Sequence, residues 1–362
     1  MYSRALITSD LLRLKSRGSE WISSTCPNIR WLAHLLRPAL SACGLRPETL
    51  TWDERIGASS DHYFDGAAVY DRLGLDIHPV SWAGLVNAER APQAFVDALS
   101  SAVDDALVIG YELPPVMIDA LRQLNRPYVD VVLHPWRFMP DLVFALRSNV
   151  PAIQSALANF RLDEAAAKQQ ASLILAKSEW MSKFNMPPGT VLVLGQVPDD
   201  RAVVSAEGRY NSLQDHMAAL HRLCADHPMV LFKPHPYAGK VCASAKAVAH
   251  LPAIQSVSHN FYHLLCQPEL DKVVALNSSG LIEAQVFGKR SQNLTPFLYD
   301  FAKGGPEALI PIDSRWTQTD FWRTLLHGVD VAPASVLPLP DQSLRRAMNG
   351  DWGYGFIDKV CA

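Results

Sequence analysis

The chain lacks what a membrane protein, a disulfide scaffold or a nucleic-acid binder needs. No apolar run reaches the ~18 residues that span a bilayer, and the N-terminal segment has no apolar core before a small-residue cleavage site. The six cysteines never stand in C-x-x-C spacing, which argues against a zinc knuckle and a disulfide framework. Lys and Arg (33) do not outnumber Asp and Glu (36), so the chain lacks the excess of positive charge that is typical of a nucleic-acid-binding protein. We therefore expect a cytoplasmic protein with reduced thiols and no nucleic-acid partner.

Signatures of common cofactors and metals are missing as well. Neither G-x-G-x-x-G nor the Walker pattern occurs, so NAD and ATP have no recognisable site. The metal-ligand patterns H-x-H, HExxH and D-x-D are absent, and His216 and His221 have the wrong spacing for one helix face. We expect neither a cofactor nor a metal.

The composition is that of an ordinary globular protein. Hydrophobic residues make up 49% of the chain and charged residues 19%, enough to build buried cores. A length of 362 residues exceeds what one core usually covers. Two domains are therefore predicted.

In the second half, short apolar runs alternate with helix-like stretches. The runs predict buried strands at 191–197, 229–233, 253–257 and 272–277, and the stretches predict helices at 211–226, 241–250, 261–266 and 280–288. Such alternation is typical of a parallel, doubly wound sheet.

The first half follows the same plan less clearly. It predicts strands at 106–112, 128–133 and 172–176 and helices at 116–125 and 150–170. The break KFNMPPGT at 183–190 separates the halves. We predict an α/β protein with two Rossmann-like domains facing a cleft, over 1–187 and 188–340, and a tail over 341–362 that packs back on the first domain.

Polar residues follow three predicted strands of the second half. Asp200 follows the first, His235 stands between two prolines after the second, and Ser278-Ser279-Gly280 follows the third. Because parallel strands present their carboxyl ends at one edge, where ligands of open α/β sheets bind, these groups should converge on one crevice.

Each of these groups also has a plainer structural role. Ser278 or Ser279 can cap the helix that begins near Gly280, and Glu283 one turn later can balance the helix dipole or accept a hydrogen bond from a ribose. Asp200 can bond its own turn or act in catalysis.

The two prolines hold His235 in a rigid loop, where it can donate to a phosphate beside Lys233. His-Pro occurs three more times, so only its place at a strand end distinguishes His235.

Taken together, these motifs resemble the capsule polysaccharide biosynthesis family. They are Gly195-Gln196-Val197-x-x-Asp200, Lys233-Pro234-His235-Pro236, and Asn277-Ser278-Ser279-Gly280-x-x-Glu283-Ala284-x-x-x-Gly288-Lys289. The family includes retaining β-Kdo transferases of capsule and O-antigen assembly. The His-Pro and Ser-Ser elements are similar to those of bacterial sialyltransferases, which also use CMP-activated keto-acid sugars. The resemblance covers about residues 191–300, with a weaker echo at 109–112 and 134–138.

The resemblance implies a GT-B-like fold whose C-terminal domain binds CMP-β-Kdo and whose N-terminal domain binds the acceptor. The implied donor-binding residues are Gln196, Lys233, His235, Pro236, Asn277, Ser278, Ser279, Gly280, Glu283 and, from the first half, Arg137. Arg137 would pair with the sugar carboxylate or extend from an aromatic cluster. His235 would stabilise or protonate the departing phosphate without a metal.

Retention of configuration implies two displacements. The resemblance places the nucleophile on Asp200, which would form a covalent glycosyl-enzyme. Glu112, at the end of a first-half strand, is the candidate base for the acceptor, with Asp130 in reserve.

The same residues are compatible with three other functions. In an inverting, sialyltransferase-like transfer, Asp200 would act as the base. A non-catalytic subunit would bind CMP or glycan, and a metal-dependent phosphoesterase would use His134, His235 and Asp200. A lipid-linked glycan acceptor would bring the protein to the inner face of the inner membrane, beside other enzymes of polysaccharide synthesis.

Overall fold

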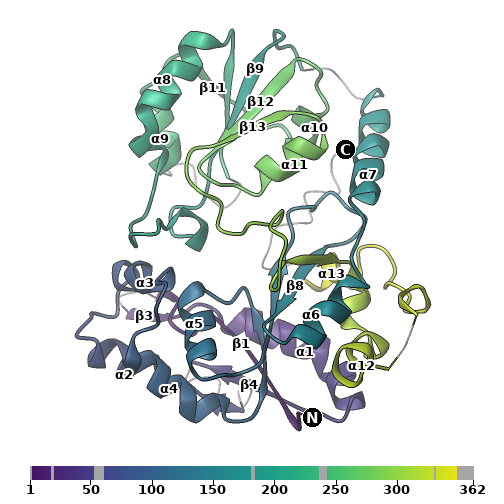
Figure 1. Cartoon of the computed structure of the whole chain (residues 1–362). Helices are drawn as coiled ribbons and strands as arrows, with labels where there is room; N and C mark the ends of the chain where they lie inside the picture. The colour runs from purple at the N-terminus through teal and green to yellow at the C-terminus, as the bar shows by residue number, and fades with distance from the viewer. Residues whose placement is uncertain are drawn as a thin grey trace.

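Two β-sheets, each covered by helices on both faces, organise the chain (Figure 1). The structure, a computed structural model, describes residues 2–17, 20–52, 61–180, 184–235, 243–329 and 332–348. Within these residues one sheet has seven strands and the other five, and β2 (Leu14–Arg17) and β3 (Glu20–Ser23) form a separate hairpin. The architecture is mixed α/β with Rossmann-like parallel sheets, as predicted.

The first sheet has the order β14-β8-β7-β6-β1-β4-β5. Its strands are β1 (Arg4–Ser9), β4 (Arg46–Thr51), β5 (His62–Tyr63), β6 (Leu107–Tyr111), β7 (Tyr128–Leu133), β8 (Phe144–Ser148) and β14 (Ile310–Ile312). From β5 to β7 neighbouring strands pair in parallel, whereas β8 and β14 add an antiparallel edge. The pairing of Ser9 with Tyr111 brings the carboxyl ends of β1 and β6 side by side.

Helices cover both faces of this sheet. One face carries α1 (Cys26–Ala42), α6 (Pro151–Ala158) and α12 (Thr319–His327), and the other carries α2 (Gly66–Arg72), α3 (Pro79–Val86), α4 (Gln93–Val103) and α5 (Pro115–Gln123). In α1, Ile29, Leu32, Leu36 and Leu40 are fully buried. This spacing of three or four residues gives the helix the apolar stripe that it packs on the sheet.

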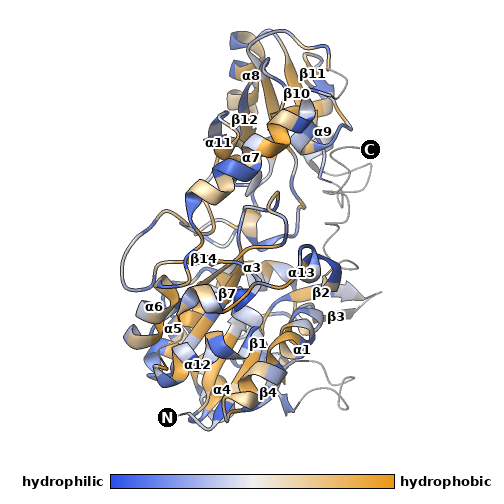
Figure 2. Ribbon diagram, turned by 90° about the vertical axis from the view of Figure 1, so that its right-hand side faces the viewer, coloured by the Kyte–Doolittle hydropathy of each residue, from blue (hydrophilic) through white to orange (hydrophobic). Residues whose placement is uncertain are grey.

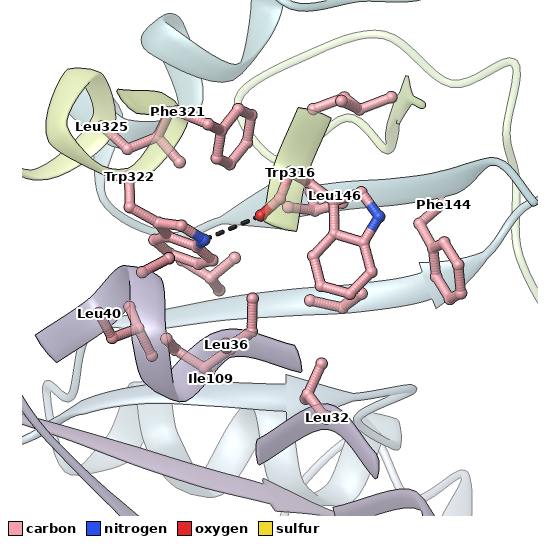
Figure 3. Packing of buried hydrophobic residues seen from close by; sticks show 14 of the residues in the cluster. Leu32, Leu36, Leu40, Ile109, Phe144, Leu146, Trp316, Phe321, Trp322 and Leu325 are labelled. Atoms are coloured by element: carbon pink, nitrogen blue, oxygen red, sulfur yellow. Dashed lines mark hydrogen bonds between the residues drawn. The ribbon is translucent and has the colours of Figure 1, made fainter. Parts of the chain in front are cut away.

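The chain returns to the first sheet well before its last residues (Figure 3). Trp316 and Trp322 are fully buried against α1, and the Trp322 Nε1 donates a 2.8 Å hydrogen bond to the Trp316 carbonyl. The segment from β14 to α13 (Ser343–Ala347) therefore belongs to this core. The sequence places only residues 341–362 there; how the two cores divide into domains stays a prediction.

The second sheet is parallel throughout, in the order β11-β10-β9-β12-β13. Its strands are β9 (Thr190–Leu194), β10 (Val230–Lys233), β11 (Ile254–Ser256), β12 (Leu270–Ala275) and β13 (Arg290–Asn293). The 3-10 turn η3 (Leu213–His216), α8 (Met217–Asp226) and α9 (Ala243–Ala249) cover one face. The other carries α7 (Glu164–Ser178), α10 (Phe261–Leu265) and α11 (Gly280–Val286). All four predicted strands are confirmed, and the polar edge strand β13 is an addition.

One strand prediction is wrong. Residues 172–176 (SLILA) lie inside α7, which Asp163 caps by accepting a 2.9 Å hydrogen bond from the Ala165 N–H. The run EAAAKQQ before them consists of strong helix formers, and a short apolar run alone does not separate strand from helix. The helix predicted at 150–170 is accordingly two helices, α6 and α7.

Apolar residues lie mainly on the strands and on the helix faces that cover them (Figure 2). Across the described ranges, no helix is both long enough and apolar enough to cross a bilayer.

Candidate functional site

The carboxyl ends of β10, β9 and β12 lie side by side, with β9 in the middle. Gly195, directly after β9, donates its N–H to the Lys233 carbonyl at 2.9 Å. A Cβ at Gly195 would lie 3.1 Å from the Phe232 ring and 3.3 Å from the His235 backbone nitrogen. Glycine at this position thus lets the His235 loop approach the end of β9.

A pair of amide side chains ties the ends of β9 and β12 together. The Gln196 Nε2 donates to the Asn277 Oδ1 at 3.0 Å, and the Asn277 backbone N–H donates to the Gln196 Oε1 at 3.1 Å. The Asn277 Nδ2 also donates to the carbonyls of Ala202 and Pro296. These two amides therefore fix the loop that carries Asp200, and their predicted contact with a donor stays a prediction.

Asp200 begins the 3-10 turn η2 (Arg201–Val203) after β9. Its Oδ1 accepts a 3.2 Å hydrogen bond from the Ala202 N–H, the plainer role that the sequence left open. The side chain is nevertheless 49% exposed, and the Arg13 Nη2 lies 3.8 Å from the Oδ1. Asp200 thus combines a fixed backbone with an accessible carboxylate, which a nucleophile or a base needs.

Arg201 links this loop to the first sheet. It is 5% exposed, and its Nη1 donates 3.0 Å hydrogen bonds to the Glu112 carbonyl and to the Tyr299 hydroxyl. Asp200 is consequently held near the carboxyl end of β6.

Glu112 follows β6 directly and has a left-handed backbone with φ of +50°. Burial raises the pKa of its carboxyl, the negative charge of Asp200 raises it further, and the charges of Arg201 and Arg13 oppose the increase. The two carboxyl groups, from different sheets, thus act on one another electrostatically.

Asp130, the reserve base, is fully buried on β7. One of its oxygens accepts from the Leu113 N–H at 2.9 Å, and the other accepts from Arg147 at 2.8 and 3.0 Å. This carboxylate is engaged in supporting the segment after Glu112.

His235 is partly buried at the end of β10. Burial lowers the pKa of the imidazole, the positive charge of Arg137 lowers it further, and the negative charge of Asp200 acts in the opposite direction. The lowered pKa favours the neutral form of the imidazole. Pro236, which follows it, lies outside the described residues.

The other residues predicted to bind the donor also lie at the carboxyl edge of the second sheet, and each has its own hydrogen-bond partners. The Lys233 Nζ donates to the His259 carbonyl at 2.6 Å, and the Ser278 Oγ accepts from the Gly280 N–H at 3.2 Å. Ser279 is partly buried and makes no capping hydrogen bond. A Cβ at Gly280 would lie 2.8 Å from Leu194, so this glycine allows α11 to start close to β9.

Glu283 is 3% exposed inside the protein. Its Oε1 accepts from the Tyr262 hydroxyl at 2.6 Å and from the Arg137 backbone N–H at 3.2 Å. Burial raises the pKa of Glu283 to about 7, although the charge of Arg137 and the Tyr262 hydrogen bond favour the ionised form. This carboxyl joins the segment after β7 to α11.

His134, which the phosphoesterase reading needs, is packed among aromatic rings. Its Nδ1 accepts from the Trp136 N–H at 3.2 Å, and the rings of Trp136 and Phe301 lie 4.4 and 4.9 Å away. Burial lowers its pKa to about 3. Within the part of the chain that the structure describes, no three His, Cys, Asp or Glu side chains form a group that could hold a metal ion.

The sequence reasoning missed three residues of this region, Asp10, Arg13 and Arg201. Asp10 directly follows β1, so the same strand-end rule would have found it had β1 been predicted. The arginines carry no motif, and only the contact between the two sheets reveals them.

Comparisons with known proteins do not assign this chain to a family. No family model matches the sequence, and no curated protein matches it. Among solved structures, the chain is similar to KpsC, beta Kdo 2,7 transferase, of Thermosulfurimonas dismutans, with a TM-score of 0.34 and 11% identity over 68% of this chain and 78% of that one. A second KpsC chain of that organism, beta Kdo 2,4 transferase, has a TM-score of 0.33 and 13% identity over 52% and 68%.

Proposed function

We propose that this chain is a retaining glycosyltransferase that moves Kdo from CMP-β-Kdo to a bacterial surface glycan of the O-antigen or capsule type. One observation carries the proposal: the accessible carboxylate of Asp200 directly precedes Arg201, which is hydrogen-bonded to the backbone of Glu112, so the two carboxyl residues meet at one contact. An accessible carboxylate and a second carboxyl whose pKa is raised can divide the roles of nucleophile and proton carrier, as in retaining sugar chemistry. The order of the strand-end motifs supports the choice of donor.

In the first displacement, the Asp200 carboxylate attacks the anomeric carbon of the donor. The bond from that carbon to the phosphate oxygen breaks, and its electron pair leaves with CMP. A neutral His235 donates a hydrogen bond to the departing phosphate, which stabilises the charge that develops there. The proposal needs neither a metal nor a cofactor.

In the second displacement, Glu112 takes the proton of the acceptor hydroxyl. The acceptor oxygen attacks the anomeric carbon, the ester to Asp200 breaks, and the carboxylate of Asp200 is restored. Glu112 lies on the first sheet, so this sheet would carry the acceptor and the second sheet the donor, in a two-domain GT-B arrangement. A lipid-linked acceptor would bring the protein to the inner membrane and to a polysaccharide-synthesis complex.

The decisive experiment is a search for the covalent intermediate. Wild-type protein incubated with CMP-β-Kdo should gain the mass of one Kdo on the peptide that contains Asp200, and Asp200→Asn should not. Asp199→Asn is the matched control, because Asp199 is the exposed neighbour on the same peptide. It should form the adduct as the wild type does.

Other outcomes reject the proposal in distinct ways. An inverted product anomer by NMR, without an adduct, would make Asp200 a base in an inverting transfer. If CMP raises thermal stability while no donor is consumed, the chain is a non-catalytic binding subunit.

A further inference from the structure

Arg13 lies between β1 and β2 on a rigid support. Its guanidinium lies over the Trp82 ring, 5.4 Å from the ring centroid. Trp82 is 2% exposed, and its Nε1 donates a 2.9 Å hydrogen bond to the Asp10 carboxylate. A guanidinium stacked on a fixed indole is held by one flat face, which leaves its N–H edge for another partner.

That edge faces the candidate nucleophile without being bonded to it. The Arg13 Nη2 lies 3.8 Å from the Asp200 Oδ1, beyond the ~2.7–2.9 Å of a charge-assisted hydrogen bond. Among the side chains that the structure describes, none accepts a hydrogen bond from this guanidinium, which is 29% exposed. Its donors are thus available to a ligand placed beside Asp200.

The chemistry of a keto-acid sugar puts a carboxylate at that place. In such sugars the carboxylate is attached to the anomeric carbon itself. In an in-line displacement the leaving phosphate lies on the side of that carbon opposite the attacking oxygen. A cation beside the nucleophile therefore reaches the carboxylate more readily than the phosphate.

We propose that Arg13 binds the donor's carboxylate and selects keto-acid sugars over sugars that lack this group. The assignment rests on the function proposed above and makes Arg13 a specificity residue of the same site. Under this assignment Arg13, rather than Arg137, pairs with the sugar carboxylate.

The test compares CMP-Kdo with its C1 carboxamide, in which the carboxylate charge is removed. The release of CMP gives kcat/KM for both donors with wild type, Arg13→Met, Arg13→Lys and the control Arg161→Met, an exposed arginine after α6. The affinity for CMP alone is measured in parallel. For each variant, kcat/KM for CMP-Kdo is divided by kcat/KM for the carboxamide. Comparing this ratio between variants cancels the effect of the amide on the reactivity of the anomeric carbon.

We expect the wild type and Arg161→Met to prefer the carboxylate by roughly 10- to 100-fold. Arg13→Met should lose this preference with an unchanged affinity for CMP, and Arg13→Lys should keep part of it because the charge remains without the planar fork. A preference that survives in Arg13→Met overturns the assignment and leaves the proposed function standing. If Arg13→Met loses affinity for CMP together with its preference for the carboxylate, the assignment is also overturned, since Arg13 would then bind the phosphate. A wild type that releases no CMP from CMP-Kdo overturns both.

Discussion

Arg201 donates a 3.0 Å hydrogen bond to the backbone carbonyl of Glu112, and this contact joins the loop after β9 to the end of β6. Asp200 precedes Arg201 directly, so the buried guanidinium sets where one carboxyl stands relative to the other. The same nitrogen also bonds the Tyr299 hydroxyl at 3.0 Å. The geometry proposed for two displacements thus depends on a residue that need not touch the substrate.

Arg201→Lys tests this dependence. A lysine has no planar fork and cannot reproduce both hydrogen bonds, so the Asp200 loop should shift relative to Glu112. We expect kcat to fall about 100-fold, the effect of a misplacement on the order of 1 Å. The free energy of unfolding should fall by roughly 1–3 kcal/mol. Arg209→Lys, an exposed change in the same segment, should alter neither. Wild-type kcat in Arg201→Lys would contradict the positioning role.

The titration of His235 tests whether Asp200 lies close to it. Asp200 is the charge that holds the pKa of His235 up against burial and Arg137. Asp200→Asn should therefore lower this pKa further, and Arg137→Met should raise it. An NMR pH titration of histidine-labelled protein gives the value directly.

His221 provides an internal reference, since it is exposed on α8 on the far side of the sheet from α11. The NMR signals of the His221 ring should be the same in all three proteins at each pH. If Asp200→Asn leaves the pKa of His235 unchanged, the two residues do not share a site, and the proposed catalysis fails with them.

The second sheet could be predicted because its information is local. Apolar runs bounded by turn residues define β9, β10 and β12, and the rule for parallel strand ends then places Asp200, His235 and Asn277 at one edge. The first sheet follows this rule only in part. Apolar runs correctly predict β6 and β7 at 106–112 and 128–133, whereas its other strands are not predicted. Its strand β4 (RPETLT) contains proline and charge, and its core is completed by Trp316 and Trp322 from the far end of the chain.

The electrostatics of the site could not be predicted for the same reason. Arg201 and Glu112 are 89 positions apart and meet only in the folded protein. The sequence predicts that Glu283 balances the helix dipole or contacts the donor. Only the fold shows that it is buried beside Tyr262 and that its pKa is raised.

The buried Glu283 should make stability depend on pH. Its pKa is about 7 in the folded protein and close to 4.5 in the unfolded chain, so between these values the folded state binds more protons. The free energy of unfolding should therefore fall as the pH rises from about 4.5 to about 7, by on the order of 3 kcal/mol, and then level off.

Glu283→Gln should remove this dependence. The glutamine Oε1 can still accept from Tyr262 and Arg137, and no carboxyl remains to ionise. Chemical denaturation at a series of pH values should show Glu283→Gln gaining stability over the wild type as the pH increases. Glu179→Gln, at an exposed position, should follow the wild type. Parallel curves for wild type and Glu283→Gln would show that Glu283 is ionised throughout this range.

Glu112→Gln separates the two displacements. Under the proposed mechanism the attack by Asp200 needs no base, so the covalent adduct should still form. Its transfer to the acceptor should slow by about 100- to 10,000-fold because the acceptor proton has no carrier. The adduct on the Asp200 peptide should then accumulate in the presence of acceptor, whereas in the wild type and in the exposed control Glu89→Gln it turns over. In the wild type the rate of this step should rise with pH through a pKa above the usual range of a glutamate, since burial raises the pKa of Glu112. Asp200 is esterified during this step and adds no charge. If the adduct of Glu112→Gln turned over at the wild-type rate, Glu112 would not be the base. Asp200 would then be the only carboxylate assigned to the mechanism.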